Sequence, residues 1–145
     1  MKKLMLIGRV GAGKTTLTQA LRGEELRYSK TQYIHHDSCI IDTPGEYIET
    51  RQLGGALALY AYEADIVGLV LSADEPYSQF SPNITGLVNR EVIGIVSAID
   101  KPKAKPERAE KWLKLCGCKR IFFCSAATGE GLSDLIAYLN GDFQK

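Results

Sequence analysis

The chain has 145 residues, of which 45% are apolar, and 18 basic and 17 acidic side chains give it a formal net charge of +1. This size and composition fit a single domain, residues 1–145, with a full hydrophobic core. The near-neutral charge provides no overall field to recruit nucleic acid or an anionic membrane, and no stretch approaches the roughly 18 apolar residues of a membrane span. We expect a soluble protein that binds neither nucleic acid nor membrane.

The amino-terminal residues predict a strand followed by a helix. Residues 4–7 are a short apolar run typical of a parallel strand buried on both faces. Residues 14–22 have helical spacing, with Leu17 and Leu21 on one face, and Gly23 is expected to end this helix. The polar residues 24–30 are expected to be irregular.

Residues 33–42 predict an antiparallel hairpin. Two short strands, 33–36 and 39–42, flank Asp37-Ser38, which suits a two-residue turn. The second strand would end at Asp42. The next element is a helix over residues 53–63, where apolar side chains recur on one face.

The remaining chain alternates strands and helices. Its expected strands are 66–71, 92–96 and 121–124, and its expected helices are a short one at 84–89, one opening at Pro106 and one over 132–139. Together the elements predict an α/β three-layer sandwich with a mainly parallel six-stranded sheet and one antiparallel hairpin strand. In such sheets ligands bind beyond the carboxyl ends of the strands.

The cysteines and histidines do not suggest a metal site. There is no Cys-x-x-Cys pair, and the two histidines are adjacent. We expect Cys124, inside a strand, to be a buried apolar side chain, and Gly117 to cap the preceding helix. Four unpaired thiols suit a reducing cytoplasm.

Residues 8–15 read Gly-x-x-x-x-Gly-Lys-Thr between the first strand and the first helix, which is a P-loop. Successive backbone N–H groups in such a turn cradle phosphates, Lys14 reaches the β- and γ-phosphates, and the Thr15 hydroxyl is placed to ligate Mg²⁺. The expected phosphate-binding residues are Gly8, Arg9, Val10, Gly11, Ala12, Gly13, Lys14, Thr15 and Thr16.

Asp42-Thr43-Pro44-Gly45 at the end of a strand has the form of a second phosphate motif. In P-loop nucleotidases such a carboxylate holds Mg²⁺ through water and the glycine N–H meets the γ-phosphate. Thr31, one strand upstream, is placed to close over the γ-phosphate and Mg²⁺. A strand-ending turn at Asp42 and an ordinary loop threonine at Thr31 are the structural alternatives.

With these motifs the chain resembles the Ras-like P-loop GTPases of the translation-factor class over nearly its whole length. That resemblance implies that Asp100 accepts hydrogen bonds from guanine and that the backbone at Ser125 and Ala126 meets the base. The family's Asn/Thr-Lys-x-Asp reads Ser97-Ala98-Ile99-Asp100 here, without the lysine that packs on the base. Both GTP and ATP therefore stay open.

More specifically, the P-loop, Lys30-Thr31-Gln32 and Asp42-Thr43-Pro44-Gly45-Glu46-Tyr47 resemble the EutP/PduV family of ethanolamine- and propanediol-utilisation proteins. The resemblance implies a cytoplasmic bacterial protein associated with a metabolic microcompartment. It is compatible with both a small regulatory GTPase and an ATP-dependent acetate kinase.

Glu46 stands where many switch GTPases have a glutamine that orients the attacking water. Its carboxylate suits a general base, or it repels the γ-phosphate and slows attack. Three activities stay open: a slow Mg²⁺-dependent nucleoside triphosphatase that recruits a shell or enzyme partner, a phosphotransferase from ATP to acetate, and a nucleotide-stabilised adaptor. Lys14, Thr31, Gly45 and Glu46 would carry catalysis, and Thr15, Thr31 and Asp42 would hold the metal.

Overall fold

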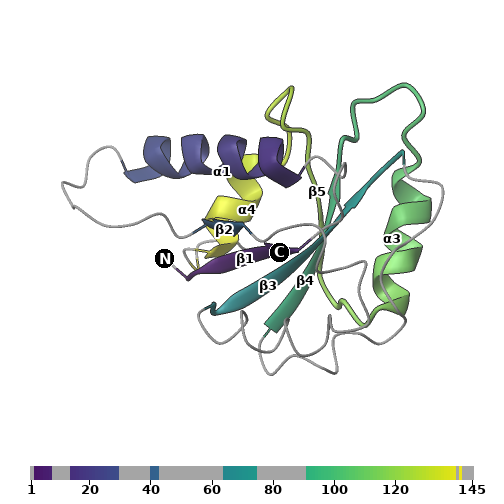
Figure 1. Ribbon diagram of the computed structural model, residues 1–145, viewed down its shortest axis with the longest axis horizontal. Helices are drawn as coiled ribbons and strands as arrows, with labels where there is room; N and C mark the ends of the chain where they lie inside the picture. The colour runs from purple at the N-terminus through teal and green to yellow at the C-terminus, as the bar shows by residue number, and fades with distance from the viewer. Residues whose placement is uncertain are drawn as a thin grey trace.

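The computed structural model describes residues 2–7, 14–29, 40–42, 64–74, 91–139 and 141, and the structural statements below concern these residues. They form five strands and three helices (Figure 1). The strands are β1 (Leu4–Ile7), β2 (Ile40–Asp42), β3 (Ile66–Ser72), β4 (Glu91–Ser97) and β5 (Ile121–Phe123), and the helices are α1 (Lys14–Ser29), α3 (Pro106–Leu115) and α4 (Leu132–Leu139).

The strands form one sheet in the order β2-β1-β3-β4-β5, and every neighbouring pair is parallel. All residues of β1 and β3 are buried, as expected for strands covered on both faces. Because the strands share one direction, their carboxyl ends meet along a single edge of the sheet. Any site assembled from strand-ending residues therefore lies along that edge.

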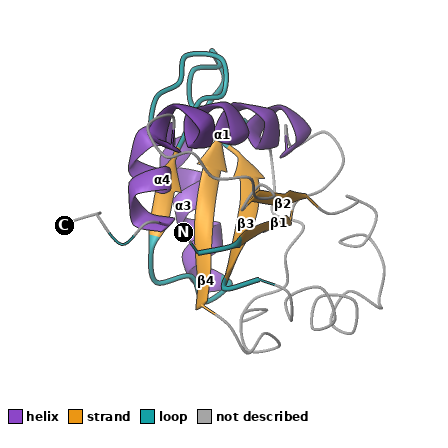
Figure 2. Ribbon diagram, turned by 90° about the vertical axis from the view of Figure 1, so that its left-hand side faces the viewer, coloured by secondary structure: helices purple, strands orange, loops and turns teal. Residues whose placement is uncertain are grey.

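Helices cover both faces of the sheet and make three layers. Figures 1 and 2 show α1 and α4 together on one face and α3 on the other. Alternate β3 residues divide between the two cores: Ile66 and Val70 belong to the core with α1 and α4, whereas Val67 and Leu69 belong to the core with α3. The period-two alternation of a strand explains this division.

The helices of the carboxyl half follow from their sequence. Pro106 opens α3, where its missing N–H costs nothing, and Ala109 and Leu113 are buried. The helix ends at Leu115 with Cys116 as its C-cap, and Gly117 follows with a φ of 106°, a conformation that favours glycine. In α4 the residues Leu132, Leu135, Ile136 and Leu139 form the buried stripe.

One expectation from the sequence needs correction. Helix α1 runs to Ser29, so Gly23 does not end it and residues 24–29 are helical rather than irregular. Nothing lies within 4 Å of the position that a Cβ at Gly23 would occupy. This glycine is an exposed helical residue that lowers helix stability by about 1 kcal/mol relative to alanine, and the helix-forming Glu24-Glu25-Leu26-Arg27 continue beyond it.

The parallel pairing of all neighbouring strands agrees with the predicted mainly parallel sheet. The described residues contribute five strands, so they do not test the sixth strand or the antiparallel hairpin. The partner strand expected at 33–36 lies outside the described residues, as do the helices expected at 53–63 and 84–89. In the described part of the chain no helix is long and apolar enough to span a membrane.

Candidate functional site

The described residues at the borders of the two predicted phosphate motifs lie at the carboxyl edge of the sheet. Strand β1 ends at Ile7, just before the P-loop, and α1 begins at Lys14, at the P-loop's end. Asp42, the last residue of β2, is in register with Leu6 of β1. The strand, helix start and neighbouring strand end that a P-loop site requires are therefore adjacent.

The structure describes this region only in part. Lys14, Thr15 and Asp42 are placed as backbone positions, and Thr16 is exposed in the first turn of α1. The other predicted phosphate, switch and catalytic residues lie outside the described residues: Gly8, Arg9, Val10, Gly11, Ala12, Gly13, Thr31, Gly45 and Glu46.

Asp100 and Ser125, two of the three residues expected to contact a base, meet in the structure. The Ser125 hydroxyl donates a hydrogen bond of 2.7 Å to Oδ1 of Asp100, although 25 residues separate them. The Ile99 N–H donates to the Cys124 carbonyl at 3.4 Å and holds the two segments together beyond β4 and β5. Ser125 is fully buried whereas Asp100 is exposed. The buried hydroxyl thus fixes the orientation of an exposed carboxylate.

The loop from Ser125 to Gly131 is held by its own hydrogen bonds. The Ser125 N–H donates to the Glu130 carbonyl at 2.9 Å, and the Gly129 N–H donates to the Ser125 carbonyl at 2.8 Å. The Thr128 N–H donates to the Ser125 hydroxyl at 3.1 Å. Ser125 therefore bonds both to its own loop and to Asp100, while Ala126 stands partly exposed at the start of the turn.

Gly131 closes this loop against β5. Its φ is +81°, and a Cβ there would lie 2.0 Å from the carbonyl oxygen of Phe123. Both the backbone conformation and the contact require glycine. Gly129 also has a positive φ of +85°, but its surroundings are open. Both glycines thus meet a conformational requirement, and Gly131 meets a steric one as well.

Ala98 replaces the family lysine and has a φ of 58°, which is uncommon for a residue with a Cβ. This turn directs Asp100 to the carboxyl edge, and the Lys101 N–H donates to the Ala98 carbonyl at 3.2 Å. The methyl group of Ala98 cannot cover a base as a lysine stem would. Of the four residues 97–100, Asp100 therefore stays the one predicted to contact a base.

A polar cluster beside this turn was not predicted. Lys101 Nζ lies 3.4 Å from Asp74 Oδ2, and the Ser72 hydroxyl donates to Asp74 Oδ1. The Ser72 hydrogen bond, followed by the positive charge of Lys101, lowers the pKa of Asp74. The sequence shows polar residues, Ser72 and Asp74, at the end of β3, which could have indicated a polar site there. It does not show that Asp74 pairs with Lys101, which follows β4.

The candidate metal ligands agree with magnesium chemistry but not with a protein-only metal cage. Among the residues with described side chains, no three His, Cys, Asp or Glu groups gather as a metal site. Mg²⁺ in phosphate sites takes few protein ligands and completes its shell with phosphate oxygens and water. Thr15 and Asp42, whose backbones lie on adjacent elements, stay the predicted ligands, and both residue types carry oxygens of the class that Mg²⁺ binds.

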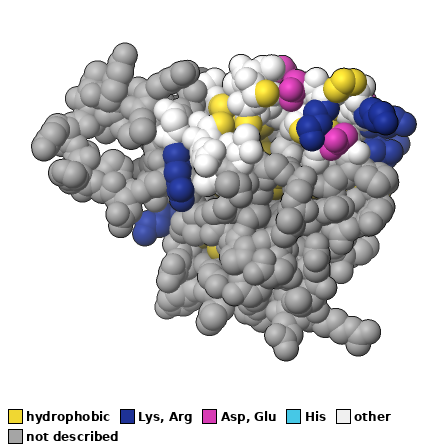
Figure 3. Space-filling view, turned by 45° about the horizontal axis from the view of Figure 1, so that its top comes forward, with side chains coloured by type: hydrophobic (Ala, Val, Ile, Leu, Met, Phe, Trp, Pro, Cys, Tyr) yellow, Lys and Arg dark blue, Asp and Glu magenta, His cyan; other side chains and the backbone are white. Residues whose placement is uncertain are grey.

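Figure 3 shows basic side chains next to acidic ones at one end of the visible face. Near Ser125, Cys124 is fully buried, and burial raises the pKa of its thiol to about 12. The prediction that Cys124 packs as an apolar side chain is confirmed, and its thiol stays protonated near neutral pH.

Comparisons with known proteins identify the family of this chain. Residues 1–141 match the family described as "Ethanolamine utilisation - propanediol utilisation", PduV-EutP. The chain is 50% identical over 143 residues to the propanediol utilization protein PduV of Citrobacter freundii, covering 97% of this chain and 94% of that protein.

More distant relatives point to two kinds of activity. The chain is 32% identical over 142 residues to the probable acetate kinase EutP of Escherichia coli strain K12, covering 96% of this chain and 89% of that protein. It is 33% identical over 124 residues to GTPase Era of Mycobacterium tuberculosis strain H37Ra, covering 69% of this chain but 41% of that protein.

Proposed function

The chain belongs to the PduV-EutP family and is distantly related to the GTPase Era, and on this premise we propose that it is a Mg²⁺-dependent P-loop GTPase with slow intrinsic turnover. It acts as a switch for a partner in propanediol or ethanolamine utilisation. The partner is a microcompartment shell protein or an enzyme, and the protein works in the cytoplasm beside that compartment.

The hydrogen bond from Ser125 to Asp100 is the observation that carries the choice of base. Guanine presents an N1–H and an exocyclic amine side by side, and a carboxylate accepts hydrogen bonds from both. A carboxylate at the carboxyl edge, held at one oxygen by a buried hydroxyl at 2.7 Å, is oriented before a nucleotide arrives. Adenine has no such pair of donors, so Asp100 favours GTP over ATP. The backbone of Ser125 and Ala126 completes the base site.

The phosphate residues have separate roles in this proposal. Backbone N–H groups of residues 8–13 cradle the β-phosphate, and Lys14 bridges the β- and γ-phosphates. Thr15, Thr31 and Asp42 hold Mg²⁺, which neutralises phosphate charge when it is bound. The Gly45 N–H binds the γ-phosphate and Glu46 lies beside the attacking water.

Slow turnover follows from these groups. P-loop GTPases without a supplied arginine hydrolyse GTP at about 10⁻⁴ to 10⁻² s⁻¹. The negative charge of the Glu46 carboxylate repels the γ-phosphate, whereas the neutral amide of a glutamine would not, so Glu46 does not raise this rate. The triphosphate therefore persists long enough to hold Thr31 and Gly45 in the conformation that a partner recognises. Hydrolysis then releases that partner.

Binding titrations with fluorescent GTP and ATP analogues test the base assignment. We expect GTP to bind at least tenfold tighter than ATP in the wild type and Asp100→Ala to abolish that preference, because a hydrogen bond to a charged group contributes about 1.5–3 kcal/mol and 1.4 kcal/mol is tenfold in affinity. Lys14→Ala should weaken both nucleotides equally. Equal affinities in the wild type, unchanged by Asp100→Ala, would contradict the guanine site.

A second candidate is phosphoryl transfer from ATP to acetate, which the name of the EutP relatives favours. A carboxylate oxygen of acetate would attack the γ-phosphorus, the bond to the bridging oxygen of ADP would break, and acetyl phosphate would leave. Lys30 and Arg51 are the cations that we assign to acetate in this case. In a third candidate, a nucleotide-stabilised adaptor, Glu46→Ala has no effect on function whereas Lys14→Ala abolishes nucleotide binding.

A further inference from the structure

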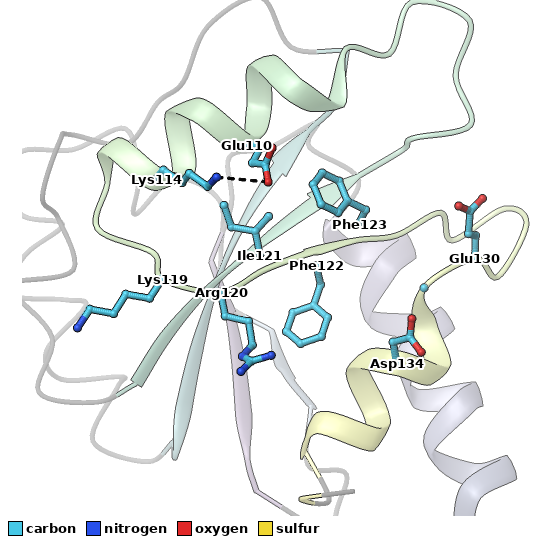
Figure 4. Close-up of a pocket in the computed structure, with 10 residues that line it drawn as sticks. Glu110, Lys114, Lys119, Arg120, Ile121, Phe122, Phe123, Glu130 and Asp134 are labelled. Carbon is cyan, nitrogen blue, oxygen red and sulfur yellow. Dashed lines mark ion pairs between the residues drawn. The ribbon is translucent and has the colours of Figure 1, made fainter. Parts of the chain in front are cut away.

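A cavity of about 510 Å³ runs along β5, on the side of the sheet that faces away from β4 (Figure 4). Its floor is β5 itself, and its walls come from α3 and from the turn that leads into α4. Within the described residues β5 is the last strand of the sheet. We call this feature the β5 groove.

The floor of the β5 groove presents backbone groups. The Gly94 N–H donates to the Arg120 carbonyl and the Cys124 N–H donates to the Val96 carbonyl, both at 2.8 Å. Peptide groups in a parallel pair alternate in direction, so residues 120, 122 and 124 face β4. The N–H groups of Ile121 and Phe123 and the carbonyl of Ile121 therefore face the groove. Edge groups of this kind are a template for a further strand.

The two ends of the β5 groove carry opposite charges. Lys119 is exposed at the amino end of β5, and Glu130 and Asp134 are exposed at the carboxyl end. At the amino end, Lys114 lies 3.7 Å from Glu110, and the Arg120 guanidinium stacks on the Tyr138 ring at 4.9 Å. Lys119 is thus the basic side chain best placed to meet an acidic group of a ligand.

The walls select the kind of occupant. Side chains of α3 and of the start of α4 flank β5 (Figure 4). If a second copy of the protein paired with β5 through its own β5, that strand would also lie at the floor of a groove. The walls of the two grooves would then collide before the two strands came within hydrogen-bonding distance. A single extended segment has no such walls. At about 3.3 Å per residue, roughly five residues of such a segment would cover β5 and both charged ends.

We propose that the β5 groove binds an extended segment of a partner protein as an added strand. The segment has β-branched residues at its centre, an acidic side chain beside Lys119 and a basic side chain beside Glu130 and Asp134. Main-chain hydrogen bonds to Ile121 and Phe123 supply affinity, and the charges at the two ends set the direction of the segment. This binding surface is separate from the proposed nucleotide site, and peptide binding to it requires no nucleotide.

Two fluorescent peptides of the same composition and opposite order probe the groove: Lys-Val-Thr-Val-Glu and Glu-Val-Thr-Val-Lys, both with blocked ends. We expect one of them to bind the full-length protein with a Kd below about 1 mM. Its amide N-methylated form should not bind, because methylation removes main-chain donors. Failure of both peptides to bind, or equal binding of the methylated form, would overturn the proposal.

Charge exchange tests the direction. The variant Lys119→Glu with Glu130→Lys leaves the net charge unchanged and should invert the preference between the two peptides. The matched control, Lys103→Glu with Glu107→Lys, changes exposed residues outside the lining of the groove and should leave the preference as in the wild type. A preference that the first exchange does not change would overturn the assigned charges.

Amide hydrogen exchange tests strand addition itself. Bound peptide should slow exchange at Ile121 and Phe123 at least tenfold, whereas binding through side chains alone would leave both amides unchanged and overturn the proposal. Sedimentation equilibrium tests the alternative occupant. A dimer of the free protein that dissociates when peptide is added would assign the β5 groove to a second copy, against the proposal.

Discussion

Replacing Gly131 by alanine should destabilise the fold far more than the same replacement at Gly129, although both glycines have nearly the same backbone conformation. Their φ angles are +81° and +85°. The difference lies in their surroundings. A Cβ at Gly131 would lie 2.0 Å from the Phe123 carbonyl oxygen, whereas nothing lies within 4 Å of a Cβ at Gly129.

The two costs can be separated. A left-handed backbone costs an alanine about 1–2 kcal/mol, and this is the whole expected effect of Gly129→Ala. At Gly131 the neighbour is backbone and cannot turn aside, so the loop or β5 must move, and overpacking of this kind adds about 1–3 kcal/mol. We therefore expect a loss of roughly 2–5 kcal/mol for Gly131→Ala.

Urea unfolding of the wild type and the two variants, followed by circular dichroism, measures these differences. A loss at Gly131 that exceeds the loss at Gly129 by at least about 1 kcal/mol agrees with the contact. Equal losses would refute this contact and would mean that residue 131 does not lie against the Phe123 carbonyl of β5. Gly131→Ala should also weaken GTP binding, because Ser125 is bonded to the neighbouring Glu130 carbonyl.

Other substitutions test the remaining parts of the structure. Ser125→Ala should lower GTP affinity about tenfold with little change for ATP, since the Asp100 carboxylate loses its orienting bond, and an equal loss for both nucleotides would contradict that role. Gly68→Ala should cost about 1–3 kcal/mol in urea unfolding, because its Cβ would lie 2.9 Å from the Ile95 side chain, and a neutral result would refute such close packing. Folding lowers the pKa of Asp74 from its ordinary value of 3.8, so its contribution to stability is full above pH 3.8 and is lost as the pH falls through the lower pKa of the folded state. In Asp74→Asn the free energy of unfolding should therefore fall less steeply at acid pH than in the wild type. An unchanged pH dependence would contradict the cluster. Burial raises the pKa values of the Cys118 and Cys124 thiols to about 12. In the Cys39→Ser variant these thiols should therefore react with a disulfide reagent at pH 8 only as the protein unfolds. Reaction in the native state would contradict their burial.

Local patterns were sufficient to predict most of the described elements. The apolar runs of β1, β3 and β4, the proline at the start of α3 and the apolar stripe of α4 each have one plausible structure. The end of α1 was not predictable from Gly23 alone, because a glycine on an open surface lowers helix stability without stopping a helix whose following residues favour it.

Contacts between distant segments were the harder part. A mainly parallel sheet was predicted, but the position of β2 beside β1 depends on the path of the chain between them, and no local turn signal indicates it. The meeting of Asp100 with Ser125 was expected through the family resemblance rather than from spacing. The Asp74 cluster with Lys101 was missed because its members follow different strands. Edge groups of β5 likewise become visible only once strand order is known.

One measurement addresses the proposed function most directly. Phosphorus resonances of the purified protein would be followed with Mg²⁺, equal concentrations of GTP and ATP, and acetate. We expect slow growth of inorganic phosphate at the expense of GTP, absent in Lys14→Ala, with ATP and acetate unchanged. Growth of acetyl phosphate at the expense of ATP, lost in Lys14→Ala, would contradict the GTPase and assign the site to phosphoryl transfer to acetate.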